Sequence, residues 1–239
     1  MKSAVIGLGE TGRPLFEILQ EAYPDIIGWD CDANKMKGIK HTVLDKGRKL
    51  DIINICIPYS DTFLDVVNER VLATGASLVI IHSTVPIGTT SKIRNAVHSP
   101  ILGRHGRMKE DLKWFPKWIG GEKADEALNY LVKAGFYCAA PTEEKSETTE
   151  ALKLMCLAKY GMSIAFAQYQ QEICKKYNFP YEKVKIWDEL YNANIKGNIK
   201  RPILDPPNGK IGGHCVIQNT KILNEQHPNK ILEEILRYA

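Results

Sequence analysis

The sequence predicts an α/β protein with a doubly wound parallel sheet in its N-terminal part and an all-helical C-terminal part. Two observations support this fold class. Before residue 143, short runs of Ile, Val and Leu alternate with helical patterns, as expected for parallel strands covered on both faces. After residue 144, the long proline-free stretch Glu144–Tyr177 is typical of one central helix. We therefore expect one domain at residues 1–143 and a second at 144–239.

The five expected strands are short apolar runs. They are Ser3–Gly7, Asp25–Asp30, Asp51–Pro58, Ser77–Ser83 and Val132–Pro141. Helices between them are expected at Pro14–Tyr23, Leu64–Ala73 and Thr89–Val97, where apolar residues recur at helical spacing. Repeated alternation of strand and helix predicts right-handed crossovers and a mostly parallel sheet.

The C-terminal part is expected to be built on the long helix Glu144–Tyr177. Further helices are predicted at Tyr181–Tyr191 and Asn229–Tyr238. Between them, Arg201–Val216 is rich in Pro and Gly and is predicted to form a loop.

Composition places the chain among ordinary globular proteins. Of its 239 residues, 44% are hydrophobic and 25% are charged, which argues against disorder. A net charge of +4 is too weakly basic to indicate nucleic-acid binding. No apolar run approaches the roughly 20 residues that span a bilayer, so we expect no membrane partner.

The cysteines indicate the compartment. All six are dispersed and none forms a CxxC pair, so neither a disulfide framework nor a zinc or other metal site is expected. The N-terminus opens directly into the first predicted strand, and no signal peptide is expected. Both observations predict a reducing, cytoplasmic location.

A glycine motif joins the first strand to the first helix. Gly7, Gly9 and Gly12 follow the GxGxxG spacing, with Glu10 and Thr11 between them. Gly7 permits a tight turn, Gly9 lets a pyrophosphate approach the backbone, and Gly12 lets helix and strand pack closely. The helix N-terminus offers N–H donors and partial positive charge to phosphates. This context predicts a Rossmann-type domain that binds a dinucleotide.

The second strand ends in an acid that would select the cofactor. Asp30 lies 18 positions beyond Gly12 and is expected to accept hydrogen bonds from the adenosine ribose. Its negative charge disfavours a 2′-phosphate, so the predicted cofactor is NAD rather than NADP. Asp32 is the competing acid, although we expect it to lie past the end of the strand.

Several further segments follow one another in order along nearly the whole chain. They are GLGETG at the glycine turn, Gly28–Asp32 (GWDCD), Asp51–Pro58 with its Cys-x-Pro ending, Ser83–Thr90 (STVPIGTT), Glu150–Lys153 in the predicted central helix, Ile164–Phe166 downstream, and Gly212–Cys215 (GGHC). Together these segments resemble the UDP-glucose/GDP-mannose dehydrogenase family, which has STVPPGTT at the fourth segment and its nucleophile loop at the last. The glycine turn is shared by many families, whereas the STVP and GGHC segments are specific. The resemblance implies that Pro58, Ser83 and Thr84 join the glycine turn in binding NAD.

The resemblance also implies an activity. In that family a sugar-nucleotide alcohol is oxidised to a carboxylate by two hydride transfers to NAD, through a cysteine thiohemiacetal and a thioester. Cys215 occupies the nucleophile position, and since a thiolate is required, its site is expected to lower the thiol pKa. Lys153 occupies the position of an electrostatic partner that stabilises a developing alkoxide or holds a water.

The chain also departs from the family pattern. Leu157 stands where the family has an Asn, one helical turn after Lys153. Val216–Asn219 replaces the usual Pro-Lys-Asp continuation, and Ser99–Gly121 takes the place of the substrate loop with its glutamate. The sequence stops 24 residues after Cys215, so the family's C-terminal nucleotide-binding domain is expected to be missing.

Candidate substrate residues are mostly cations, which predicts an anionic small molecule as the partner. Arg is the best candidate because its planar fork matches phosphate or carboxylate. The candidates are Arg104 and Arg107, with His105 and Lys109 beside them, then Arg201 and Lys210 flanking the cysteine loop, and Gly212 and Gly213 before the cysteine. Trp187, Tyr191 and Asn192 are expected either to cover that loop or to form an aromatic core.

Three functions stay open on the sequence alone. The first is the NAD-dependent dehydrogenase described above, acting on a sugar nucleotide or a smaller substrate. The second is a β-hydroxyacid-type dehydrogenase, which needs no cysteine. The third is a non-catalytic NAD-binding sensor or assembly protein, which Leu157 and Gln218 favour. In each case, the apolar faces of residues 144–177 predict a homodimer through this helix.

Overall fold

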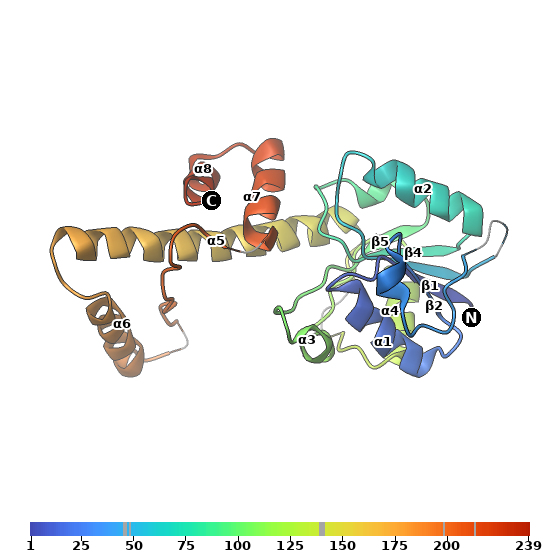
Figure 1. The fold of residues 1–239 in the computed structure, drawn as a ribbon, viewed down its shortest axis with the longest axis horizontal. Helices are drawn as coiled ribbons and strands as arrows, with labels where there is room; N and C mark the ends of the chain where they lie inside the picture. Colours follow the sequence, from blue (N-terminus) through green and yellow to red (C-terminus); the bar gives the residue numbers. More distant parts are fainter. Residues whose placement is uncertain (45–46, 48, 139–141, 198, 213) are drawn as a thin grey trace. The chain divides into compact units, whose positions relative to one another are not determined.

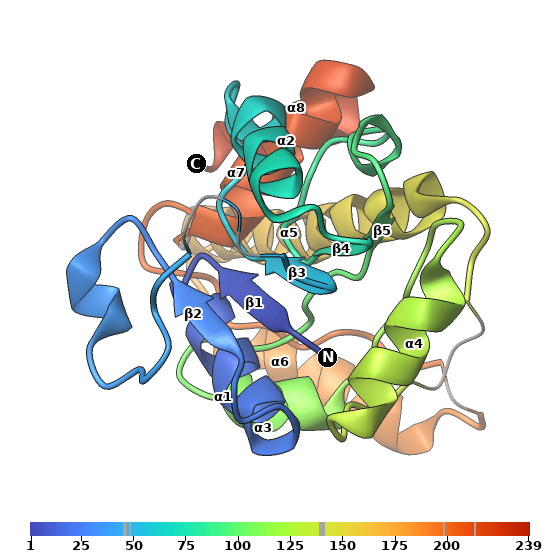
Figure 2. The ribbon, with the colours of Figure 1, turned by 90° about the vertical axis from the view of Figure 1, so that its right-hand side faces the viewer.

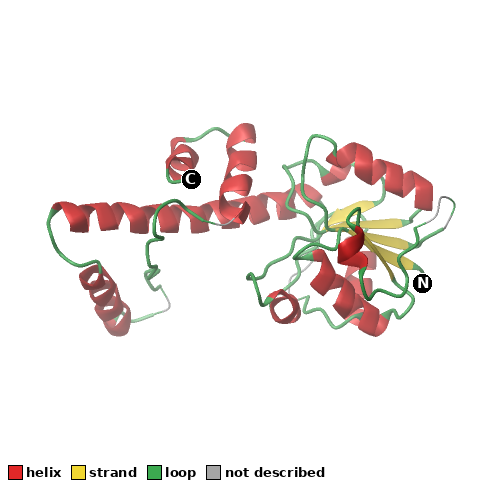
Figure 3. Ribbon diagram, viewed as in Figure 1, coloured by secondary structure: helices red, strands yellow, loops and turns green. Residues whose placement is uncertain are grey.

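A computed structural model describes residues 1–239 with the exception of 45–46, 48, 139–141, 198 and 213. The chain forms two compact units, Met1–Lys153 and Leu154–Ala239 (Figure 1). The first unit contains the sheet and its covering helices, and the second contains only helices among its described residues (Figure 3). The predicted α/β fold class is confirmed. The units divide inside a long helix, after the predicted boundary at residue 144.

The sheet of the first unit is fully parallel. Its strands are β1 (Ser3–Ile6), β2 (Ile27–Trp29), β3 (Ile52–Ile55), β4 (Leu78–Ile81) and β5 (Ala96–His98), in the spatial order β2-β1-β3-β4-β5. Ile6 stands between Trp29 and Ile55 in the register. The strand order reverses between β1 and β3, and ligands of such sheets bind beside the carboxyl ends of the strands at this reversal.

Helices cover both faces of the sheet, as Figure 2 shows. One face carries α1 (Gly12–Ala22), α3 (Met108–Trp114) and α4 (Ala124–Lys133), and the other carries α2 (Phe63–Thr74). Successive strand residues point to opposite faces. Val5 accordingly lies in the core with α1, whereas Ala4 and Ile6 lie in the core with α2. This double burial explains the continuous apolar runs in the strands.

Two predicted elements of the first unit are wrong. The helix expected at Thr89–Val97 is only the short 3-10 turn η2 (Thr90–Lys92), followed by strand β5. Asn95, with a left-handed φ of 57°, redirects the chain, and Ala96–His98 pairs with β4. The strand expected at Val132–Pro141 begins inside α4, whose Tyr130 and Leu131 are buried. A turn at Gly135 follows, and residues 139–141 lie outside the described part of the chain.

The long helix α5 (Ser146–Lys176) confirms the central helix and belongs to both units. In the second unit it is followed by α6 (Glu182–Asn194), α7 (His214–Gln226) and α8 (Lys230–Arg237). Gly161 of α5 allows α7 and α8 to approach, because a Cβ there would lie 2.7 Å from Val216 and 3.0 Å from Ile235. No helix in the described residues is both long and apolar enough to cross a membrane.

The loop expected at Arg201–Val216 ends earlier than predicted. Helix α7 begins at His214, so Cys215 lies in the first turn of a helix. The apolar residues Val216, Ile222 and Leu223 are buried on one face of this helix. The Pro/Gly-rich composition of the preceding segment concealed the start of this helix.

Candidate functional site

The glycine turn packs tightly against the end of β3. Gly7 has a φ of 90° and its N–H donates to the Trp29 carbonyl oxygen. A Cβ on Gly7 would lie 2.7 Å from the Cys56 carbonyl oxygen, and a Cβ on Gly12 would lie 1.8 Å from the Gly7 carbonyl oxygen. A Cβ on Gly9 would meet no protein atom within 4 Å. Gly9 therefore leaves open space beside the turn, as a bound phosphate would require.

The N-terminus of α1 faces the same turn. Its N-cap residue Thr11 makes no side-chain cap hydrogen bond, and its first turn contains no acidic residue. The helix therefore keeps its N-terminal partial positive charge for an external anion. The neighbouring Glu10 is exposed, and its carboxylate is bonded to the His105 ring.

Asp30 is buried at the end of β2. Its two carboxylate oxygens accept the N–H groups of Leu8, at 2.7 Å, and of Asp32, at 2.9 Å. Burial alone would raise the pKa of Asp30, but these backbone hydrogen bonds and nearby Lys35 lower it below the usual value. The acid is thus a carboxylate tied to the glycine turn. Asp32 is exposed and caps the 3-10 helix η1 (Ala33–Met36).

The next two strand ends lie along the same edge. Ser83 follows β4 and donates from its hydroxyl to the Ile57 carbonyl oxygen at 2.6 Å. Pro58 is exposed after β3, and Thr84 is half-buried after β4. With the glycine turn and Asp30, these residues fit a dinucleotide laid along the carboxyl edge of the sheet.

The first turns of α5 are bonded to this edge. Thr149 contacts His98 Nδ1 at 2.8 Å, and His98 Nε2 lies 3.1 Å from the Ser83 carbonyl oxygen. Glu150 accepts hydrogen bonds from the loop after β4, and Lys153 Nζ donates to the Ile101 carbonyl oxygen at 2.8 Å. Burial lowers the pKa of His98 to about 3, so its ring is neutral. Its Nε2–H then donates to Ser83, and its Nδ1 accepts the Thr149 hydroxyl.

A buried lysine that the motifs did not indicate lies behind this edge. Lys117 is 2% exposed and donates to the carbonyl oxygens of Ser99, at 2.8 Å, and Pro100, at 3.1 Å. Burial lowers its pKa to about 7, against the opposing influence of the Cys56 and Cys138 thiols. No spacing in the run around Lys117 distinguishes it from a surface lysine.

The candidate cations of the Ser99–Gly121 segment have carboxylate partners. Arg104 forms a two-pronged pair with Asp111, at 2.7 and 2.9 Å, which lowers the Asp111 pKa to about 2. Arg107 pairs with Glu110 at 2.9 Å, and Lys109 pairs with glutamates of α1. These cations therefore do not converge on one shared anion site, because each is paired with a carboxylate. Their role in substrate binding stays a prediction.

In the second unit, Cys215 is half-buried and its carbonyl oxygen accepts the Asn219 amide at 2.6 Å. Leu157 is half-buried on α5, Gly212 and Lys210 are exposed, and Gly213 lies outside the described residues. Among the described residues, no group of three or more His, Cys, Asp or Glu forms a candidate metal site.

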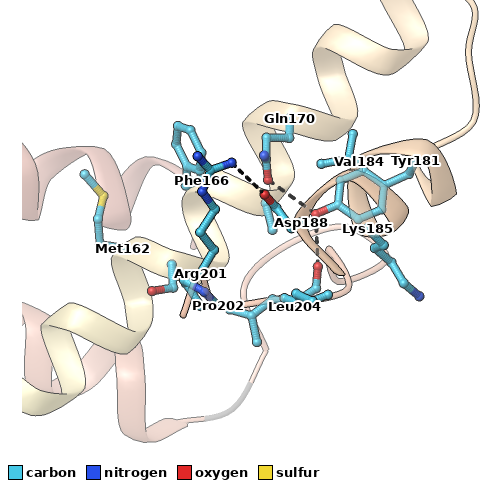
Figure 4. A pocket seen from close by; sticks show the side chains of 13 residues that line it. Met162, Phe166, Gln170, Tyr181, Val184, Lys185, Asp188, Arg201, Pro202 and Leu204 are labelled. Atoms are coloured by element: carbon cyan, nitrogen blue, oxygen red, sulfur yellow. Dashed lines mark hydrogen bonds and ion pairs between the residues drawn. The ribbon is translucent and has the colours of Figure 1, made fainter. Parts of the chain in front are cut away.

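Arg201 lines a pocket of about 460 Å³ between α5, α6 and the following loop (Figure 4). Its guanidinium lies 3.6 Å over the Tyr191 ring and 3.3 Å from Asp188, and Asn192 bonds its backbone. Tyr191 and Asn192 therefore contact the loop at Arg201. Trp187 is 71% exposed, so it does not pack in the core of this unit.

The parallel sheet with its glycine turn, its reversal point and the buried acid after β2 defines a Rossmann-type α/β fold. The solved structure of UDP-D-ManNAc dehydrogenase from Pyrococcus horikoshii matches the whole chain with a TM-score of 0.82 and 22% identity, over 68% of that protein. A UDP-N-acetyl-mannosamine dehydrogenase from Staphylococcus aureus matches with a TM-score of 0.71 and 20% identity. The 3-hydroxyisobutyrate dehydrogenase of Mycobacterium tuberculosis matches with a TM-score of 0.72 and 12% identity, over 91% of that protein.

The chain is also similar in sequence to UDP-N-acetyl-D-mannosamine dehydrogenases. The UDP-N-acetyl-D-mannosamine dehydrogenase of Methanococcus vannielii is 26% identical over an alignment of 265 positions, gaps included, which covers 90% of this chain and 59% of that protein. The enzyme of the same name from Pyrococcus horikoshii is 26% identical over an alignment of 275 positions, which covers 93% of this chain and 64% of that protein. No protein-family model matches the sequence. The chain is therefore a distant relative of the UDP-sugar dehydrogenases and spans about three fifths of their length.

Proposed function

We propose that this protein is an NAD-dependent dehydrogenase that oxidises a CH–OH group of a sugar nucleotide or a smaller anionic substrate. The observation that carries the proposal is the carboxyl edge of the sheet. There Gly9 leaves open space, the N-terminus of α1 has no acid of its own, and Asp30 is held as a carboxylate. The relatedness to UDP-N-acetyl-D-mannosamine dehydrogenases supports the same class of reaction.

The choice of NAD rests on Asp30. A buried carboxylate beside the glycine turn repels a 2′-phosphate and accepts ribose hydroxyl groups. When bound, NAD would supply the acceptor for the hydride that leaves the substrate carbon. The glycine turn and the α1 N-terminus would hold its pyrophosphate, and Ser83 and Thr84 would flank it at the end of β4.

Lys153 is the proposed electrostatic partner. Its ammonium group is held at the sheet edge by the Ile101 carbonyl oxygen, in a half-buried position. A cation at this point stabilises negative charge as it develops on a substrate oxygen. The hydrogen bond from Lys153 to the Ile101 carbonyl oxygen also limits how far the lysine side chain can extend.

Cys215 is the proposed nucleophile, by resemblance of the GGHC segment alone. Its thiolate would add to an aldehyde carbonyl to give a thiohemiacetal, with the carbonyl oxygen taking up a proton. Leu157 provides no side-chain hydrogen bond at the position where the resembled family has Asn.

A second candidate is a β-hydroxyacid dehydrogenase. The Mycobacterium tuberculosis 3-hydroxyisobutyrate dehydrogenase shares the fold of this chain over 91% of its own length. A reaction of that type needs the cofactor edge and Lys153 but not Cys215. A non-catalytic NAD-binding protein, favoured by Leu157, would need only the cofactor edge.

We also propose a cytoplasmic homodimer formed through α5. Large apolar side chains of this helix are about half exposed, including Met155, Tyr160 and Phe166. Apolar surface of this extent on one helix is typical of a subunit contact.

One experiment separates these functions. NAD binding is measured by calorimetry, and NADH production is followed with UDP-sugars, GDP-sugars and 3-hydroxyacids. Cys215→Ser is run beside Cys156→Ser, a matched control at an exposed cysteine of α5. Carboxylate formation that stalls only in Cys215→Ser supports the four-electron dehydrogenase. Turnover of hydroxyacids that is indifferent to Cys215 supports the second candidate, and binding without turnover supports the third.

A further inference from the structure

Glu150 is a buried acid near the start of α5. The residue is 0% exposed. Both of its carboxyl oxygens accept hydrogen bonds from backbone N–H groups. Oε2 accepts from Gly88 at 2.6 Å and Oε1 accepts from Thr90 at 2.8 Å. Both donors belong to the loop Ser83–Thr90, which turns at Gly88 with a φ of 84°. The loop therefore donates one hydrogen bond to each oxygen of the Glu150 carboxyl group.

The other end of this loop is held by the residue next to Glu150. Thr149 contacts the His98 ring, which in turn donates to the carbonyl oxygen of Ser83, where the loop leaves β4. Two successive residues of α5 thus hold the beginning and the end of the segment Ser83–Thr90. Thr90 is fully buried, as is Val85 within the segment.

The same helix turn sets the position of Lys153. Residues three apart on a helix share a face, so Glu150 and Lys153 are neighbours on α5. Lys153 is bonded to the loop after β5 through Ile101. A shift of the helix relative to the loop after β4 would therefore move the lysine along the sheet edge.

We propose that Glu150 is a positioning residue of the cofactor site, whose carboxyl group holds the Ser83–Thr90 loop against the N-terminal part of α5. This inference rests on the proposed function, because it assigns the loop to an NAD site. The acid is required for a physical reason. A carboxylate offers an acceptor at each oxygen, whereas the amide of glutamine has one oxygen and would turn an NH₂ group toward an N–H donor.

The test compares Glu150→Gln with Glu69→Gln, a matched change at an exposed glutamate of α2 in the same unit. Hydrogen exchange is measured at the Gly88 and Thr90 amides of the full chain, and the dissociation constant for NAD is measured by calorimetry. Loss of a hydrogen bond to a charged group makes exchange at these amides roughly tenfold to a hundredfold faster. The affinity for NAD is expected to fall roughly tenfold in the same variant, with Glu69→Gln unchanged in both readouts.

Gly88→Ala disturbs the same contact from the loop side, since a left-handed φ disfavours Ala. If Glu150 acts through this loop, Gly88→Ala also weakens NAD binding, and the double variant is weakened no further than the stronger single variant. This second variant provides the answer should Glu150→Gln fold poorly.

Each result decides the inference. Faster exchange with unchanged NAD affinity means that Glu150 is only structural, and unchanged exchange means that it does not hold the loop. Additive losses in the double variant would likewise overturn the proposed coupling. Calorimetry of the wild type tests the proposed function separately. A wild-type protein that binds no NAD would contradict that function, and with it the cofactor role of the loop.

Discussion

At the residue scale, Gly9 and Gly12 belong to one motif but have different surroundings. A Cβ on Gly12 would overlap the Gly7 carbonyl oxygen, so the fold itself requires glycine there. Gly9 has no protein atom near its missing Cβ, so the fold does not require it. The difference separates a glycine needed for packing from a glycine needed for a ligand.

We expect Gly9→Ala to keep its stability within about 0.5 kcal/mol of wild type, as surface changes usually do, while NAD affinity falls at least roughly tenfold. Gly12→Ala is expected to lower the free energy of unfolding by more than about 2 kcal/mol, because the clash involves backbone. Urea denaturation and calorimetry measure the two effects. A Gly9→Ala variant that binds NAD normally would remove the main support for the cofactor site.

Lys117 makes stability depend on pH. Its folded pKa of about 7 lies below the ordinary value of 10.5, so the unfolded chain binds more protons between these values. The free energy of unfolding therefore rises with pH across this window, by up to about 1.4 kcal/mol per pH unit. Urea denaturation between pH 7 and 9 measures this slope.

Lys117→Met is expected to flatten that slope, whereas Lys113→Met, at a lysine of α3 that is 46% exposed, keeps it. Methionine cannot be protonated, so the folded and unfolded chains then bind equal numbers of protons at this position. Equal slopes in both variants would assign the pH dependence to other groups.

At the scale of the element, periodicity identified β1 to β4, α1, α2 and α5 because their apolar patterns match their burial. It missed β5, because Ala96–His98 is too short to show a pattern and is a strand only through its pairing with β4. It also missed α3, α4 and α7. Of α4, only Val132 and Lys133 lie in the predicted strand Val132–Pro141, and the Pro/Gly-rich segment before α7 concealed the start of that helix.

Helix α8 is an element whose start the sequence does encode. The Asn229 side chain accepts the Ile231 N–H at 3.0 Å and caps this helix. We expect Asn229→Ala to cost about 1 kcal/mol of unfolding free energy, and Asn229→Asp to cost much less, because Asp caps equally well. Thermal denaturation followed by circular dichroism compares the two. Equal losses would show that the cap contributes nothing specific.

At the scale of the whole molecule, the first unit buries its apolar residues in two cores, whereas the second leaves many exposed. Among these, Phe166 and Tyr169 of α5 are 56% and 48% exposed, and their rings are tilted at 41° with centroids 6.2 Å apart. A helix with apolar residues at several faces needs a covering surface.

We expect Phe166→Glu to convert a dimer into monomers, because a charge in an apolar contact is costly to bury. Leu72→Glu, at a residue of α2 that is 82% exposed, is the matched control and should leave the dimer intact. Light scattering after size-exclusion chromatography measures both masses. A monomeric wild type, or an unaffected Phe166→Glu variant, would contradict the proposed contact.

The sequence by itself determined the α/β class, the glycine turn, the acid after β2 and the long helix. Each is encoded locally, by periodicity or by the spacing of residues a few positions apart. Only the tertiary structure decided that β5 is a strand, that Arg104 is occupied by Asp111, and that Lys117 and Glu150 are buried. These properties depend on groups brought together from distant segments, as with Glu150 and Gly88, 62 positions apart. The type of a single residue does not identify a partner that is distant in the sequence, because the two residues meet only when the chain folds.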